Sequence, residues 1–117
     1  MKTRKETGAK GEKLAQDYLK NIGYEIIDVN KHFSRFCEID IIAKDKDTIV
    51  FVEVKTRSSE ALGSPLEAIT KNKLENIKIG AFSYLQEINF NYKKIRIDAV
   101  SVILFPKIKI NHLKNIS

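Results

Sequence analysis

A mixed β-sheet flanked by helices, in a single α/β domain, is the fold that the sequence predicts. Apolar residues recur at helical spacing in two stretches, and four stretches rich in β-branched residues lie between and after them. With 117 residues, the chain is long enough for one hydrophobic core but not for two. The predicted order is therefore α-β-β-β-α-β, in one domain that spans residues 1–117.

The first helix is predicted from about Ala9 to Asn21, because apolar residues recur there at helical spacing and Gly23 then stops the helix. Residues 1–7 are charged, and we expect them to be flexible or to lie along nucleic acid as a basic arm. Glu12 falls near the predicted helix start, where an acidic side chain suits the helix dipole.

A first strand is predicted from Tyr24 to Asn30, followed by a loop over residues 30–36 that interleaves basic and aromatic residues. In this loop Lys31 or Arg35 can hold a phosphate, and Phe33 can stack on a base. The alternative is that the aromatic residues of the loop only anchor a hairpin.

Two further strand patterns, at residues 37–43 and 48–55, carry charges where a strand is usually apolar. Side chains alternate across a strand, so Glu38 and Asp40 are predicted to share one face of the first, and Glu53 and Lys55 one face of the second. The opposite faces are apolar. Their predicted core residues are Ile39, Ile41, Val50, Val52 and Val54.

A hairpin turn at residues 44–47 would bring Asp40, Glu53 and Lys55 together at one end of the central hairpin. Two carboxylates and a lysine on a sheet are typical of a magnesium site for phosphodiester chemistry. The alternative is a solvated ladder of salt bridges across the strands. The thiol of Cys37 is not expected as a ligand, because Mg²⁺ prefers hard oxygen donors.

A polar loop with Arg57, a candidate phosphate contact, precedes the second helix. That helix is predicted to begin at a capping box over residues 64–67, or to be capped again at Thr70. Its lysines form either a solvated face or a DNA contact, and Lys73 is the first candidate for such a contact.

The last long strand is predicted over residues 95–105, and the pattern at 107–110 fits an additional edge strand whose lysines discourage aggregation. One face of the long strand carries Ile97 and Ala99, and the other carries Asp98 and Val100. Residues 111–117 are predicted to be flexible, with His112 at the surface.

The net charge is +6 and the isoelectric point is about 9.4, which favours a polyanionic partner such as nucleic acid. A single cysteine cannot form an internal disulfide. The N-terminal residues lack the apolar segment of a signal peptide, and no run is long enough to span a membrane. We therefore expect a cytoplasmic protein without a membrane partner.

The spacing of Asp40 and the sequence Glu53-Val54-Lys55 resembles the restriction-endonuclease-like PD-(D/E)xK superfamily, in which an acid precedes Glu-x-Lys by about a dozen residues. A narrower resemblance, over roughly residues 8–104, is to the YraN family of small bacterial proteins. The residues that carry it are Gly11, Glu12, Ala15, Tyr18, Leu19, Gly23, Tyr24, Asn30, Glu38 to Asp40, Phe51 to Arg57, Gly63 to Pro65, Glu67 to Ile69, Lys73, Tyr84, Leu85 and Asp98.

The resemblance implies a restriction-endonuclease-like core and a metal-dependent endonuclease that cleaves DNA, with branched or damaged DNA as candidate substrates. Asp40, Glu53 and the main-chain carbonyl of Val54 would hold Mg²⁺ or Mn²⁺, and Lys55 would orient water or stabilise charge on the phosphate.

In related folds a glutamate on the first helix reaches the metal, which makes Glu12 a secondary candidate. Glu38 would be a supporting acid or the ligand of a second ion. Cys37 departs from the family, which has glycine there, and its side chain is expected to narrow the approach of a nucleic-acid backbone.

The alternative function is a nucleic-acid-binding or partner-binding module that keeps the fold without turnover. The small core leaves no room for a separate recognition domain, so a protein partner or a homodimer is also considered.

Overall fold

The computed structural model describes residues 3–34, 37–59, 61 and 69–117. Two helices and five strands follow one another in the order that the sequence predicts, with the additional edge strand at the end. They are α1 (Arg4–Asn21), β1 (Glu25–Ser34), β2 (Cys37–Asp45), β3 (Thr48–Ser59), α2 (Lys71–Glu87), β4 (Lys94–Phe105) and β5 (Lys109–Leu113).

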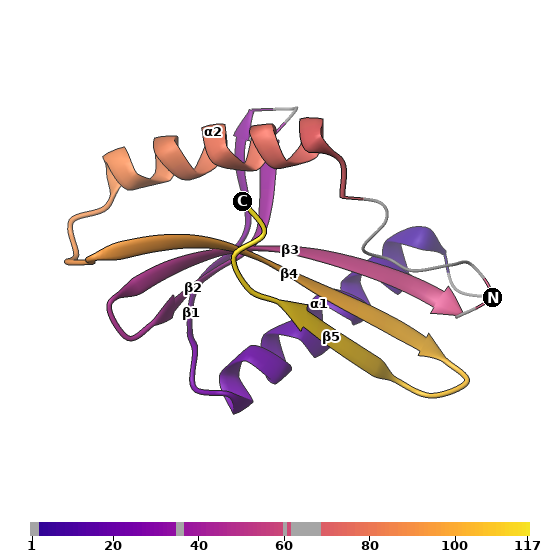
Figure 1. Cartoon of the computed structure of the whole chain (residues 1–117). Coiled ribbons are helices and arrows are strands. Elements are labelled where there is room, and N and C mark those ends of the chain that lie inside the picture. Colours follow the sequence, from indigo (N-terminus) through magenta and orange to yellow (C-terminus); the bar gives the residue numbers. More distant parts are fainter. Residues whose placement is uncertain (1–2, 35–36, 60, 62–68) are drawn as a thin grey trace.

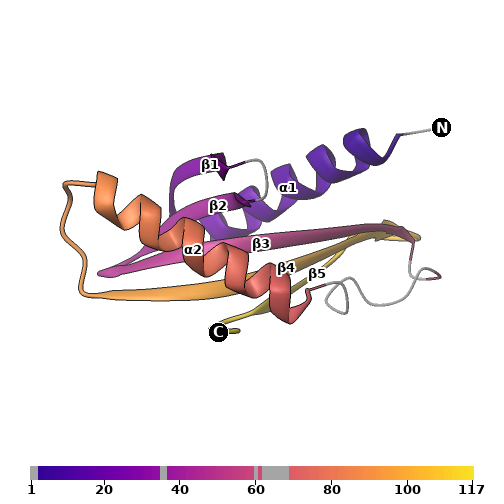
Figure 2. The same cartoon turned by 90° about the horizontal axis from the view of Figure 1, so that it is seen from above.

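The five strands form one mixed sheet in the order β1-β2-β3-β4-β5. Strands β1, β2 and β3 pair antiparallel, β3 and β4 pair parallel across the α2 crossover, and β5 pairs antiparallel with β4 at the edge. Figure 1 shows α2 above and α1 below this sheet, and in Figure 2 α2 runs obliquely across it. The predicted fold class is confirmed: a mixed central sheet flanked by helices.

Helix α1 covers the face of the sheet that presents Val50, Val52 and Val100, against which Ala15 and Leu19 are buried. It begins earlier than predicted, because Thr3 and Glu6 form a capping box that satisfies the first backbone N–H groups. Residues 4–7, for which the sequence predicted a flexible segment or a basic arm, therefore belong to the helix. Glu12 lies well inside α1 and not near its start.

The end of α1 agrees with the prediction. Gly23 adopts a φ of +98°, which costs a residue without Cβ little, and its N–H donates to the carbonyl of Lys20.

Helix α2 covers the other face of the sheet, where Ile77, Ala81 and Tyr84 pack against Phe51 and Ile97. The side chain of Thr70 caps it by accepting from the N–H of Lys73. Of the two predicted starts of this helix, the one capped by Thr70 is thus observed. The alternative capping box at 64–67 lies outside the described residues.

The hairpin of β1 and β2 differs from the prediction in two respects. Residues 31–34, expected in a loop, continue β1, and Phe33 packs against Tyr84 with the α2 core. The aromatic ring of Phe33 is therefore an anchor, as the alternative interpretation held.

The second difference concerns the faces of β2. Ile39 belongs to the core under α2 and Ile41 to the core under α1, so these two residues do not share a face. The reason is a change of direction, since β2 stops pairing with β3 at Ile41 and Val52. Figure 1 shows the distal ends of β1 and β2 turning away from β3 and rising beside α2.

Cys37 lies under α2, and its thiol donates to the carbonyl of Asn76. The space that it fills exists because Gly80 carries no side chain: a Cβ there would lie 2.6 Å from the Cys37 sulfur. The expected narrowing of a nucleic-acid path by Cys37 was therefore wrong, because its side chain points into the core.

The C-terminal segment, which the sequence predicted to be flexible, contacts a buried carboxylate. Asp98 is 0% exposed and accepts from Arg96 and from the N–H of Asn115. His112 Nε2 lies 2.7 Å from Asp98 Oδ2, and its side chain is only 4% exposed. The expected surface position of His112 was wrong, because β5 turns this side chain under α1, where Tyr18 also contacts it.

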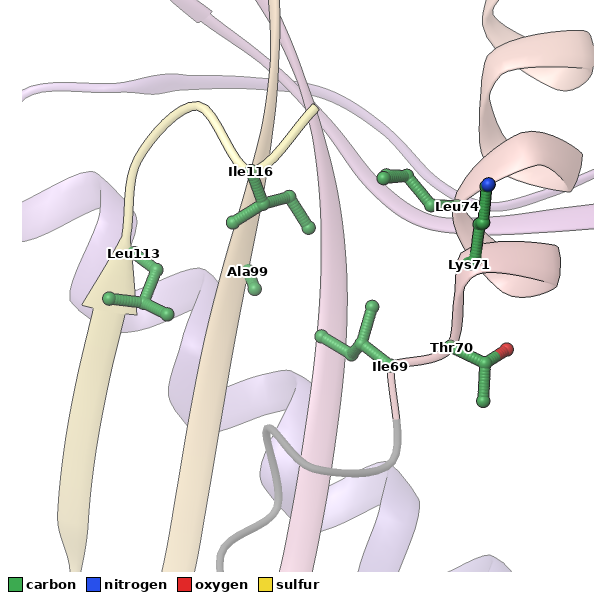
Figure 3. A pocket seen from close by; sticks show the side chains of 7 residues that line it. All are labelled: Ile69, Thr70, Lys71, Leu74, Ala99, Leu113 and Ile116. Atoms are coloured by element: carbon green, nitrogen blue, oxygen red, sulfur yellow. The ribbon is translucent and has the colours of Figure 1, made fainter.

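An apolar pocket of about 280 Å³ lies between the start of α2, β4 and the C-terminal segment. Figure 3 shows Ile69, Leu113 and Ile116 around it. None of the acidic residues singled out by the sequence lines this pocket, so the candidate site lies elsewhere. Neither helix of the described part of the chain is long and apolar enough to cross a membrane.

Candidate functional site

The candidate site lies at a fork in the sheet, where β2 leaves β3. Beyond the last pair, Ile41 with Val52, the backbone of β3 has no further ladder partner on β2. The side chain of Asp40 supplies the missing partner, since its Oδ2 accepts a hydrogen bond from the N–H of Val54 at 2.8 Å. An unpaired N–H in a sheet interior is costly, so the fork itself holds the Asp40 carboxylate against β3.

Glu53 lies one residue before that contact and is only 2% exposed. Its Oε1 lies 3.5 Å from the Nζ of Lys55 and 3.6 Å from the Nζ of Lys73. Its Oε2 is buried and has no hydrogen-bond partner among the described residues. Such burial contradicts the alternative of a solvated salt-bridge ladder.

Burial and charge act together on the two carboxylates. Burial raises the pKa of Asp40 to about 7, and the charge of Glu53 is the second cause. Burial also raises the pKa of Glu53, although Lys73 and Lys55 counteract this. Asp40 and Glu53 therefore interact electrostatically, and the two lysines offset only part of the rise that burial causes in the pKa of Glu53.

Two more acids approach Asp40 from other elements. One carboxylate oxygen each from Glu12, Glu38 and Asp40 lie within 4.8 Å of one another. Burial raises the pKa of Glu12, and the charge of Glu38 raises it further. The structure thus brings both secondary candidates to the site.

Helix α1 reaches this position because Gly11 has no side chain. A Cβ at Gly11 would lie 1.8 Å from Oγ1 of Thr56 on β3, so only glycine allows this approach. The neighbouring Glu12 is carried toward Asp40 by the same contact. The acids border a groove of about 470 Å³, whose polar lining includes Arg4, Lys5, Glu12, Asn30, His32 and Glu38.

The predicted nucleic-acid contacts separate into three groups. Lys73 lies at the site, beside Glu53, and Arg57 follows on β3 with a buried Nε that has no partner among the described residues. Lys31 instead lies 4.0 Å from Glu87, at the other end of α2 from Lys73. Arg35 lies outside the described residues.

Two features of the site were missed by sequence reasoning. The first is that Lys73 contacts Glu53, which depends on how α2 packs on the sheet. The second is Asn30, which lines the groove next to Glu12 and Glu38. It was noted only as part of a family pattern, and no local signal assigned it a role.

The side-chain oxygen donors at the fork are carboxylates, which suit a hard divalent cation. The fold is of the restriction-endonuclease-like type, as the comparison with a solved structure shows. The structure is similar to that of Hjc, a Holliday junction resolvase of Archaeoglobus fulgidus, with a TM-score of 0.52 and 20% sequence identity over 88% of this chain and 72% of that chain.

The chain belongs to the family described as Uncharacterised protein family UPF0102, which matches residues 11–102. A UPF0102 protein of Alkaliphilus oremlandii is 49% identical over 95% of this chain and 97% of its own length. A UPF0102 protein of Syntrophomonas wolfei is 44% identical over 95% of this chain and 96% of its own length. UPF0102 is the YraN family, so the family predicted from the sequence is confirmed.

Proposed function

We propose that this protein is a metal-dependent endonuclease that hydrolyses phosphodiester bonds in DNA. The observation that carries the proposal is the buried Glu53, whose Oε2 lacks a partner among the described residues, beside the ionisable Asp40. A buried carboxylate oxygen without a partner is costly, so its retention is explained by a ligand that it binds.

The donor set fits Mg²⁺ or Mn²⁺. Asp40, Glu53 and the main-chain carbonyl of Val54 would hold the ion, and Glu12 and Glu38 supply further carboxylates next to Asp40. When bound, such an ion polarises a phosphate and lowers the pKa of a coordinated water.

The lysines at the fork have a separate role. Both lysines contact Glu53 Oε1. In the reaction Lys55 would orient the attacking water or stabilise charge on the phosphate. Lys73 is less buried, with 41% of its side chain exposed, and would contact a neighbouring phosphate together with Arg57.

Branched DNA is the substrate that we propose first, because one protein of similar structure is a Holliday junction resolvase. We also propose a cytoplasmic location, where chromosomal DNA is found. Action as a homodimer or with a protein partner belongs to the proposal too, since a single small core offers little surface for recognising a junction.

The test is a cleavage screen of duplex, single-stranded, flap and four-way-junction DNA with Mg²⁺ or Mn²⁺. The parent protein should cut at least one substrate, and Asp40→Asn and Glu53→Gln should each lower the rate by about 100-fold or more. Asp17→Asn is the control, because this exposed acid pairs with Lys13 on α1. If the parent cuts no substrate, or if the variants cut as well as the parent, the proposed nuclease activity is refuted.

A binding module is the second candidate, favoured by the net charge of +6. It predicts salt-dependent DNA binding without cleavage, because neutralised phosphates release counterions. Reversing Arg57 and Lys73 to Glu should weaken binding to all sequences alike. Unchanged affinity in that double variant would remove both residues from the contact surface.

A further inference from the structure

Asn30 lies within β1 in a backbone conformation that residues with a side chain rarely adopt. Its φ is +49°, in the left-handed region, although it is neither a glycine nor at a chain reversal. Its neighbours Val29 and Lys31 pair with Ile41 and Ile39, so the register between β1 and β2 is the same on both sides of Asn30. Asparagine tolerates this region better than most residues, but glycine would adopt it more easily.

The unusual backbone turns the Asn30 amide into the acidic groove. When the amide is assigned so that its nitrogen faces the carboxylates, this nitrogen lies 3.2 Å from both oxygens of Glu12 and 3.0 Å from Oε1 of Glu38. Only this orientation of the amide satisfies its neighbours, because the other would set the amide oxygen against carboxylate oxygens. One NH₂ group therefore bridges carboxylates from α1 and β2.

This bridge opposes a repulsion that the fold creates. Glu12 and Glu38 converge with Asp40 on one spot, and the hydrogen bond from Asn30 counteracts the rise in the pKa of Glu12 caused by burial and by Glu38. The other oxygen of Glu38, Oε2, faces His32 at 3.9 Å. The two oxygens of Glu38 thus have different neighbours, and its orientation is defined from both sides.

We propose that Asn30 is a positioning residue, whose amide holds Glu12 and Glu38 at the spacing at which they and Asp40 bind a divalent cation. This inference rests on the proposed function. It explains why a left-handed position in a strand carries asparagine: glycine would supply the backbone conformation but no donor. Groups that orient metal ligands commonly change metal affinity by 10–100-fold.

Asn30→Gly is the informative variant, because it removes the amide and relieves the backbone at the same time. Loss of function in this variant cannot be ascribed to strain. Lys46→Gly is the matched control, since Lys46 has a φ of +57° in the turn between β2 and β3 and does not line the acidic groove.

Binding of Mn²⁺ alone is measured by calorimetry, without DNA. Asn30→Gly should weaken the affinity about 10-fold to 100-fold, while Lys46→Gly should leave it unchanged. If Asp40→Asn abolishes Mn²⁺ binding but Asn30→Gly binds Mn²⁺ as tightly as the parent, the role of Asn30 is refuted while the proposed metal site stands. A parent that binds no Mn²⁺ overturns the proposed metal site and this inference with it.

A metal-free double-mutant cycle tests the contact itself. In the parent, Glu12→Gln removes both the repulsion from Glu38 and the charge-assisted bond from Asn30. In the Asn30→Gly background it removes only the repulsion, so it should raise the folding equilibrium constant about fivefold more than in the parent. Equal effects of Glu12→Gln in the two backgrounds would show that the amide holds neither carboxylate.

Discussion

Replacing Gly11 by alanine tests the packing that brings α1 to the candidate site. The added Cβ would lie 1.8 Å from Oγ1, 2.6 Å from Cγ2 and 2.7 Å from Cβ of Thr56. Rotation of the Thr56 side chain moves the first two atoms but not its Cβ, which is fixed to β3. Since carbon atoms pack at about 3.5–4.0 Å, α1 must move away from the sheet by roughly 1 Å.

The magnitude follows from two opposing terms. Overpacking a well-packed interior costs about 1–3 kcal/mol, and the overlap with Thr56 places this case near the upper end. Alanine in a helix gains about 1 kcal/mol over glycine. Gly11→Ala should therefore lower the free energy of unfolding by about 2 kcal/mol. For a domain of this size, the melting temperature should fall by roughly 8 °C.

Gly8→Ala is the matched control, because Gly8 lies one turn earlier in α1 and no atom would contact its Cβ within 4 Å. It should stabilise the protein by about 1 kcal/mol. Thr56→Ala in the Gly11→Ala background removes two of the three close contacts and should restore part of the loss. Urea unfolding measures all four proteins.

The reasoning would be refuted if Gly11→Ala proved as stable as Gly8→Ala. The displacement has a second consequence, because Glu12 follows Gly11 directly and moves with the helix. Gly11→Ala should therefore also weaken Mn²⁺ binding, whereas Gly8→Ala should not.

Three further predictions concern stability. Burial beside Glu53 raises the pKa of Asp40 from 3.8 to about 7, so the folded protein binds more protons than the unfolded chain between these pH values. Without metal, the free energy of unfolding should therefore fall as the pH rises from about 4 to 7. Asp40→Asn should flatten this pH dependence in urea titrations. Asp98→Asn should cost about 3 kcal/mol in thermal unfolding, because it removes the carboxylate partner of the largely buried Arg96; a loss below about 1 kcal/mol would contradict the buried ion pair. Gly80→Ala should destabilise the parent by about 1–2 kcal/mol and the Cys37→Gly variant by less, because the nearest contact is the Cys37 sulfur; equal losses in the two backgrounds would argue against the clash.

Local patterns determined much of the fold. The two helical spacings and the alternation along β4 predicted which residues face which core, because a side chain's direction within a regular element depends only on the period of that element. The turn after Asp45 and the cap at Thr70 followed from local chemistry as well. The same alternation placed Glu53 and Lys55 together on β3, where they contact each other.

Tertiary structure decided the rest of the site. The alternation rule failed at Ile39 and Ile41 because β2 separates from β3 there. The sequence of neither strand indicates where the two strands stop pairing. Glu12 reaches Asp40 only through the contact between Gly11 and Thr56, and Lys73 reaches Glu53 only because α2 crosses that face of the sheet. His112 is buried by a carboxylate 14 residues earlier on the neighbouring strand. These pairings depend on how separate elements pack. The sequence therefore determined the chemical groups and, within regular strands, their faces, whereas the packing of α1, β2 and α2 decided which groups meet.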